Sequence, residues 1–209
     1  MTATALRTDP PVTFTARTLE VAGRSIALAE AGQGPVVLVL VPGRTAGPLV
    51  SRLAVDRRVV LADPADAPAL GPALADLIGA DAGLIAQGPH AAAAMVLALA
   101  APESVGALVL LAPTFFDALA QPADAALAAR LPDLVTPTLV AIGTRDALVP
   151  PERGMVWRRA LPKGHIMMVY DAGADLFAER PEAVAAVTGD FLARRDKFLV
   201  RVQSGLIHP

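Results

Sequence analysis

The stretch Leu84-Ile85-Ala86-Gln87-Gly88-Pro89-His90-Ala91-Ala92 decides the fold of this chain. An apolar segment, Gly83–Gln87, ends at a Gly-Pro pair, and an alanine-rich run over Ala91–Ala101 follows at once. Glycine and proline are the strongest local breakers of regular structure. We therefore predict a strand, a sharp turn at Gly88 and a buried helix.

Further apolar runs of strand length lie on both sides of this unit. Most are continuous rather than alternating, which is typical of parallel strands covered on both faces. The first two runs are joined by Gly23-Arg24, which predicts a hairpin. The predicted strands are Thr18–Ala22, Ser25–Ala31, Pro35–Val41, Arg58–Ala62, Gly83–Gln87, Ala107–Ala112, Pro137–Gly143 and His165–Tyr170.

Helical patterns separate most of these strands. Leu70, Leu74, Leu77 and Ile78 fall at helical spacing, and Pro181 is suited to the first turn of the last helix. Alternating strands and helices predict an α/β fold, a mostly parallel eight-stranded sheet between two helical layers. We divide the chain into an N-terminal arm (1–16), one domain (17–196) and a C-terminal tail (197–209).

Composition narrows the class of protein. The 209 residues are 54% hydrophobic and 18% charged, with a net charge of −2, so disorder is not expected. No basic stripe points to nucleic acid or to an anionic membrane. The longest apolar run, Ala91–Ala101, is well short of the roughly 20 residues of a membrane span. Cysteine is absent, which excludes disulfides and a thiol nucleophile. We expect a cytoplasmic protein without a cofactor or metal.

Three segments, in order, resemble the α/β-hydrolase family. The quoted stretch looks like the family's nucleophile elbow, G-x-S-x-G, and runs on to Ala101–Pro113. Pro137–Glu152, with Asp146, looks like the acid loop, and Val169–Glu182 looks like the histidine loop. The resemblance covers about Thr18–Arg195 and implies an α/β-hydrolase-like three-layer sandwich. It also implies a minimal cap over about 114–136.

The chemistry at the matching positions departs from the family. Gly88 stands at the nucleophile, and glycine has no side chain that could attack a carbonyl. Pro89 stands where the family's next residue lends an N–H to the oxyanion, and proline has none. Ala174 stands at the base, so of the triad only Asp146 remains. Gly43 matches the other part of the oxyanion region.

No other serine or histidine restores the triad by a shift of alignment. None of the four serines lies between an apolar strand and a helix. His90 is the one histidine near the elbow, either a relocated base oriented by Asp146 or Asp175, or a polar residue at a helix start. Asp171 and Asp175 with His90 lack the spacing that would indicate a metal site.

These observations leave several functions open. We expect a non-hydrolytic protein that binds a small molecule or a partner. The alternatives are an enzyme with rebuilt chemistry around His90 and Asp146, or an esterase-like hydrolase as the resemblance implies. The tail is apolar over Phe198–Val202, which predicts a homo-oligomer or a protein partner, and otherwise a strap over its own domain. Neither nucleic acid nor a membrane is expected as a partner.

Overall fold

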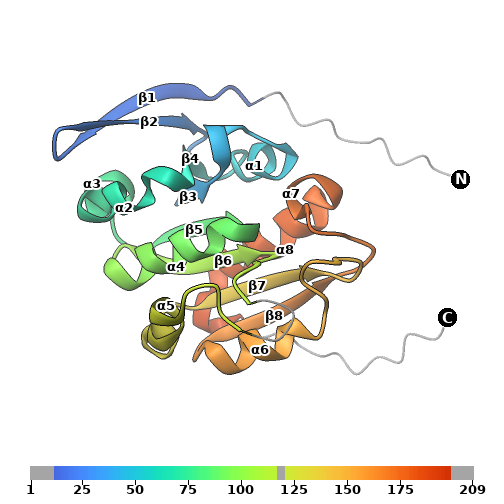
Figure 1. Ribbon diagram of the computed structural model, residues 1–209. Coiled ribbons are helices and arrows are strands. Elements are labelled where there is room, and N and C mark those ends of the chain that lie inside the picture. The colour runs from blue at the N-terminus through green and yellow to red at the C-terminus, as the bar shows by residue number, and fades with distance from the viewer. Residues whose placement is uncertain (1–11, 117–120, 199–209) are drawn as a thin grey trace, which may run out of the picture.

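The structure, a computed structural model, describes residues 12–116 and 121–198 and contains one eight-stranded sheet (Figure 1). The strand order is β1-β2-β4-β3-β5-β6-β7-β8. Strands β3 to β8 are parallel, whereas β1 pairs antiparallel with β2, and β2 with β4. The predicted α/β class and the hairpin are confirmed. The strands are β1 (Thr15–Val21), β2 (Arg24–Ala31), β3 (Val36–Leu40), β4 (Arg58–Ala62), β5 (Ala82–Gln87), β6 (Val105–Leu111), β7 (Thr138–Gly143) and β8 (Gly164–Val169).

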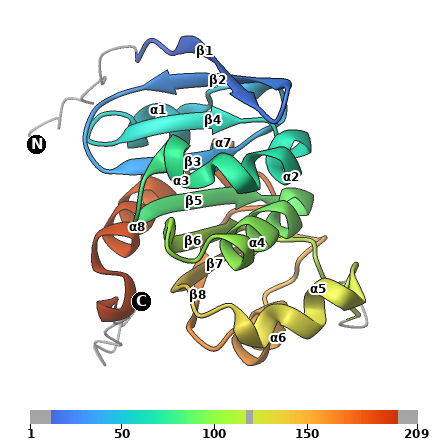
Figure 2. The same ribbon diagram turned by 90° about the vertical axis from the view of Figure 1, so that its left-hand side faces the viewer.

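Helices cover both faces of the sheet (Figure 2). Side chains alternate along β3, so Leu38 and Leu40 join one core cluster while Val37 and Val39 join the other. The first cluster includes residues of α2 to α6, and the second includes residues of α1, α7 and α8. The helices are α1 (Pro48–Leu53), α2 (Ala67–Leu70), α3 (Leu74–Ile78), α4 (Ala91–Ala100), α5 (Ala125–Arg130), α6 (Arg153–Ala160), α7 (Leu176–Glu179) and α8 (Pro181–Arg194).

The helical pattern at 70–78 is interrupted in the structure. A 3-10 turn, Gly71–Ala73, separates α2 from α3, because Pro72 has no N–H to continue an α-helix. Leu70, Leu74, Leu77 and Ile78 are nevertheless all buried on one core. The spacing therefore identified the buried face correctly and missed the break.

The segment expected to form a reduced cap contains α5. Leu127 and Leu131 pack into the core beside the sheet, as the other crossover helices do. Phe116 forms an isolated antiparallel β-bridge with Pro122. The centroid of its ring lies 4.9 Å from that of the Trp157 ring. The described part of 114–136 therefore covers a face of the sheet. Residues 117–120 lie outside the described chain.

The two ends of the domain are only partly described. β1 begins at Thr15, so its first two residues lie inside the expected arm. At the other end Phe198 is buried, with its ring centroid 5.2 Å from that of Phe191 and 5.6 Å from that of His165. Residues 1–11 and 199–209, which hold most of the expected arm and tail, lie outside the described chain. Within the described residues, no helix has the length and apolar character needed to cross a membrane.

Candidate functional site

The candidate site lies where β3, β5 and β6 end, at the edge where open α/β sheets bind ligands. Gly88 follows β5 directly with a φ of 59°, the left-handed conformation that glycine adopts most readily. The 3-10 turn Gly88–His90 then leads into α4. The predicted sharp strand-to-helix turn is therefore present. A Cβ at Gly88 would meet no other atom within 4 Å, so a side chain here would point into open space.

A pocket of about 370 Å³ lies over this turn. Its walls are mainly apolar and come from the ends of β3, β5 and β6 and from the loops after β7 and β8. Its volume is within the range of small-molecule sites. The lining residues are Leu40, Val41, Pro42, Gln87, Gly88, Pro89, His90, Ala112, Thr114, Leu148, Ala174, Asp175 and Phe177.

The oxyanion region is occupied by the protein's own bonds. Gly43 donates its N–H to Oδ2 of Asp63 at 2.8 Å, and Arg44 donates its N–H to the Val41 carbonyl at 3.1 Å. Backbone hydrogen bonds from Ala65 and Gly43 lower the pKa of the Asp63 carboxyl, helped by the charges of Arg44 and His90. The Asp63 side chain thus binds the N–H of Gly43, one of the two positions that the resemblance assigns to the oxyanion region.

Asp63 was missed in the sequence. It follows the apolar run Arg58–Ala62, and a polar residue directly after a parallel strand lies at the ligand-binding edge. Its position directly after a predicted strand could therefore have identified Asp63 as a candidate site residue.

Asp146 is held within its own loop. Its side chain is buried, and Oδ1 accepts the N–H groups of Leu148 at 2.8 Å and Val149 at 2.9 Å. Oδ2 is buried without a hydrogen-bond partner among the described residues. The neighbouring Arg145 N–H donates to the Ala172 carbonyl at 2.8 Å, so the acid loop contacts the loop that carries Ala174. The hydrogen bonds of the Asp146 side chain to described residues are therefore made within its own loop.

Gln87 connects the end of β5 to the Ala174 loop. Its Nε2 donates to Oδ1 of Asp175 at 3.1 Å, and its Oε1 accepts the Phe177 N–H at 3.0 Å. Glu179 closes the same loop by accepting the Gly173 N–H at 2.8 Å. Gln87 therefore shapes one wall of the pocket, a role that the sequence pattern did not indicate.

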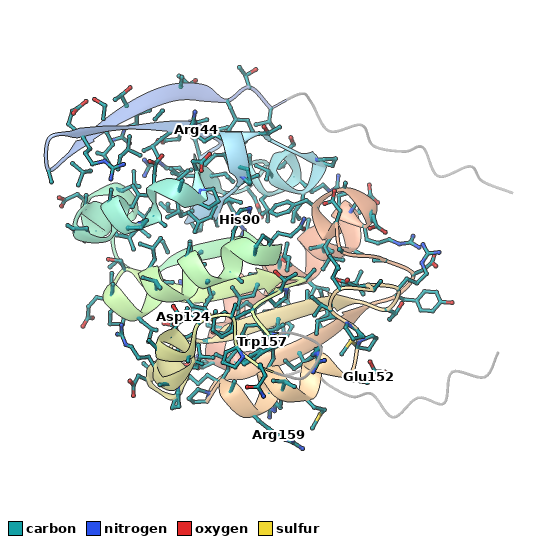
Figure 3. All side chains as sticks on the ribbon, in the orientation of Figure 1. Arg44, His90, Asp124, Glu152, Trp157 and Arg159 are labelled. Carbon is teal, nitrogen blue, oxygen red and sulfur yellow. The ribbon has the colours of Figure 1, made fainter. Side chains whose placement is uncertain are left out.

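His90 lines the pocket but is not paired with either expected carboxylate. No hydrogen bond from His90 to Asp146 or Asp175 occurs in the described chain, and Oδ1 of Asp175 already accepts from Gln87 and from the Ala178 N–H. The carboxylate that senses the charge of His90 is Asp63. His90 and Arg44, whose charges act on Asp63, are labelled in Figure 3.

Two arginines bind the carboxylate of Asp171. It makes ion pairs with Arg180 at 2.6 Å and with Arg145 at 3.1 Å. Within 12–116 and 121–198, no three His, Asp or Glu side chains are grouped closely enough to hold a metal ion.

Comparisons with known proteins place the fold. Neither a scan against protein-family models nor a search of curated sequences found a match. Solved structures do match. A serine hydrolase involved in carbazole degradation superposes with a TM-score of 0.69 at 17% identity, covering 87% of this chain and 99% of that chain. Naproxen esterase from Bacillus subtilis gives 0.70 at 14% identity, over 87% and 92%. Carboxylesterase CesB from Bacillus subtilis gives 0.68 at 16% identity, over 87% and 92%.

The agreement extends over nearly all of each compared chain, at identities that establish the architecture alone. A further match, described as an alpha/beta hydrolase enzyme, has a TM-score of 0.67 at 19% identity and covers 82% of this chain and 96% of that chain. The mostly parallel eight-stranded sheet, the turn at Gly88 and these superpositions agree, and the chain has the α/β-hydrolase fold.

Proposed function

We propose that this protein binds a small molecule in the pocket over Gly88 and does not hydrolyse it by a serine mechanism. One observation carries the proposal: the turn and the pocket are kept, while the groups that would do the chemistry are replaced. Gly88 has no side chain, Pro89 has no N–H, and the Gly43 N–H is bound to Asp63. Removal of one oxyanion donor alone typically slows such enzymes by about 10²–10³.

The pocket walls indicate the class of ligand. Leu40, Val41, Phe177 and Leu148 offer apolar surface, and His90 and Asp175 supply polar groups. Gln87 has both ends of its amide bonded within the protein, which leaves His90 as the more available polar contact. We therefore expect an uncharged or weakly acidic molecule with a short apolar body and one hydrogen-bonding group.

A second candidate is hydrolysis by rebuilt or esterase-like chemistry. Two observations favour it: the similar solved structures are a serine hydrolase and esterases, and His90 lines the pocket within electrostatic reach of Asp63. An imidazole beside a carboxylate can act as a general base toward water. In this reading His90 would be the base, and Asp63 would be the carboxylate nearest to it in electrostatic terms.

A short ester that is also a chromogenic substrate tests both candidates. We would titrate the ¹⁵N-labelled protein with p-nitrophenyl butyrate, following amide signals of Gly88, His90 and Ala174 and the release of p-nitrophenolate. Binding without release above the buffer rate supports the proposal. Release that His90→Ala abolishes supports the second candidate and overturns the first. No perturbation of these signals overturns ligand binding in the pocket.

A filled-pocket variant shows whether binding occurs at this pocket. Ala174→Phe places a ring in the pocket lining, and Ala75→Phe makes the same change on an exposed position of α3. We expect the first to abolish the titration and the second to leave it unchanged. Equal effects of the two would place the ester elsewhere on the protein.

A further inference from the structure

The two edges of the sheet differ in how they are protected. β1 forms one edge and carries Arg17 and Glu20, and charged side chains on an edge strand discourage pairing with another chain. β8 forms the other edge with the sequence Gly-His-Ile-Met-Met-Val, which has neither a permanent charge nor a proline. Burial lowers the pKa of its one titratable group, His165, which favours the neutral imidazole.

Backbone groups of β8 are left without strand partners on its outer side. Lys163 and Val169 direct their carbonyls to β7, where they accept the N–H groups of Thr138 and Thr144. Since N–H and C=O alternate from one side of a strand to the other, Ile166 and Met168 direct theirs away from β7. No described strand pairs with that side. The carbonyl of Gly164 also points outward and accepts from Arg158.

Apolar surface flanks this edge on both faces of the sheet. One groove of about 460 Å³ is lined by Met155, Ile166, Met168 and Phe198, among others. A second, of about 470 Å³, lies along Met167, Val169 and Val187. Met155, Met168 and Tyr170 are 58%, 43% and 84% exposed, unusually large values for apolar or aromatic side chains that lie together. This edge, its two grooves and these side chains are named the β8 edge.

The chain's own tail is poorly suited to complete the sheet here. Phe198 lies beside His165, near the start of β8, so a strand continuing along β8 from there would run parallel to it. The connections that lead from β5 to β6, β7 and β8 run over the face of the sheet that carries α4, α5 and α6. Helix α8 packs on the opposite face (Figure 2). A parallel strand after α8 would therefore make a left-handed crossover, which about 98% of such connections avoid.

We propose that the β8 edge is a homodimer interface, in which two copies pair their β8 strands antiparallel about a twofold axis through Met167. In this register Ile166 of each copy lies opposite Met168 of the other, and each such pair exchanges two hydrogen bonds. His165 lies opposite Val169, so no two charges face each other. Because the twofold axis is perpendicular to the sheet, each face of one sheet continues into the same face of the other. The α6 helices of the two copies therefore meet on one face.

Neighbouring registers fit less well. A shift by one residue would pair side chains that belong to opposite faces of the sheet. An axis through Ile166 would pair Met168 with Gly164, whose carbonyl is already bound by Arg158. The axis through Met167 pairs the outward N–H and C=O groups of Ile166 with those of Met168, both within β8.

Light scattering after size exclusion tests the interface, with circular dichroism as the check of folding. The full chain is expected at twice the 21.4 kDa of one copy. Met168→Lys, and independently Met155→Lys on the neighbouring helix surface, are expected to give the single-copy mass with an unchanged spectrum. Val96→Lys is the matched control, since Val96 is 42% exposed and lies on α4. It should keep the doubled mass.

Three results would overturn the proposal. The first is a full chain with the mass of one copy. The second is a doubled mass in folded Met155→Lys and in folded Met168→Lys. The third is a chain ending at Phe198 that loses the doubled mass while staying folded, because the tail would then make the contact. If Met168→Lys fails to fold, the Met155→Lys result decides.

Discussion

The backbone N–H of Gly43 lies 2.8 Å from Oδ2 of Asp63 and donates a hydrogen bond to it. This contact joins the loop after β3 to the loop after β4, on the wall of the pocket over Gly88. Pro89 supplies no N–H, so neither backbone position that the resemblance assigned to the oxyanion region is free to bind an oxyanion. We therefore propose that the site is altered in its electrostatics as well as in its nucleophile and base.

Restoring the nucleophile and the base should not restore an enzyme. In Gly88→Ser/Ala174→His, the new serine has open space around its Cβ but must adopt the left-handed backbone of Gly88. We expect p-nitrophenyl butyrate hydrolysis to stay near the buffer rate. Adding Pro89→Ala should raise the rate by about 10²–10³, because it returns one oxyanion donor. A fast double variant would show that the oxyanion region is intact without either change.

Asp146 should be replaceable by asparagine and not by alanine. Asparagine keeps an oxygen for the N–H groups of Leu148 and Val149, and it removes a buried charge whose Oδ2 has no partner among the described residues. We expect Asp146→Asn to leave the free energy of unfolding within about 1 kcal/mol of the parent, and Asp146→Ala to lower it by about 1–3 kcal/mol. Urea unfolding measures both. Equal losses would mean that Asp146 needs its charge.

Acid should destabilise the protein partly through Glu30. The hydrogen bond from Arg58, 2.5 Å long, is the largest cause that lowers the pKa of Glu30. A lowered folded pKa contributes stability above the unfolded value, near pH 4.3, that is lost as pH falls through the folded pKa. Glu30→Gln should therefore lower stability at pH 7 by roughly 1 kcal/mol or less and flatten the decline below about pH 4. Parallel acid limbs in urea series of the two proteins would contradict this assignment.

Trp157 should be the most costly core residue to truncate. It is fully buried between α6 and the sheet, where its ring meets Phe115 and Phe116. Trp157→Ala should cost about 3–5 kcal/mol. Trp157→Phe should cost about 1.5 kcal/mol, because it keeps most of the ring packing and removes an Nε1–H without a described partner. Equal unfolding midpoints for the two variants would mean that the aromatic cluster contributes little.

The sequence predicted the architecture from local patterns that act over a few residues. Continuous apolar runs marked the parallel strands, and the Gly88-Pro89 pair marked the sharp turn, because each is fixed by backbone sterics and burial. The break between α2 and α3 was missed because the helical spacing of the leucines was taken to indicate one continuous helix. Pro72, which interrupts it, was not taken into account. Asp146 lies in the loop after β7, as the sequence pattern placed it, and its hydrogen bonds are made within that loop.

The rest of the site depends on contacts between segments far apart in the chain. Gln87 and Asp175 are 88 positions apart, and Gly43 and Asp63 are 20 apart. No local pattern indicates which side chain will reach which loop at the edge of a twisted sheet. For the same reason His90 was expected beside Asp146 or Asp175, whereas the charge that reaches it is that of Asp63. The direction in which a loop side chain points can be determined only from the tertiary structure.

The most direct test of the central claim is labelling with an alkyl fluorophosphonate, read by the intact mass of the protein. The reagent reacts with a serine activated by a base and an oxyanion hole, and we propose that Gly88, Ala174 and Pro89 stand in place of those groups. We expect the mass to stay unchanged while p-nitrophenyl butyrate still perturbs the Gly88 and His90 signals. One equivalent of adduct on a single serine would contradict it, since the protein would then hold an activated nucleophile.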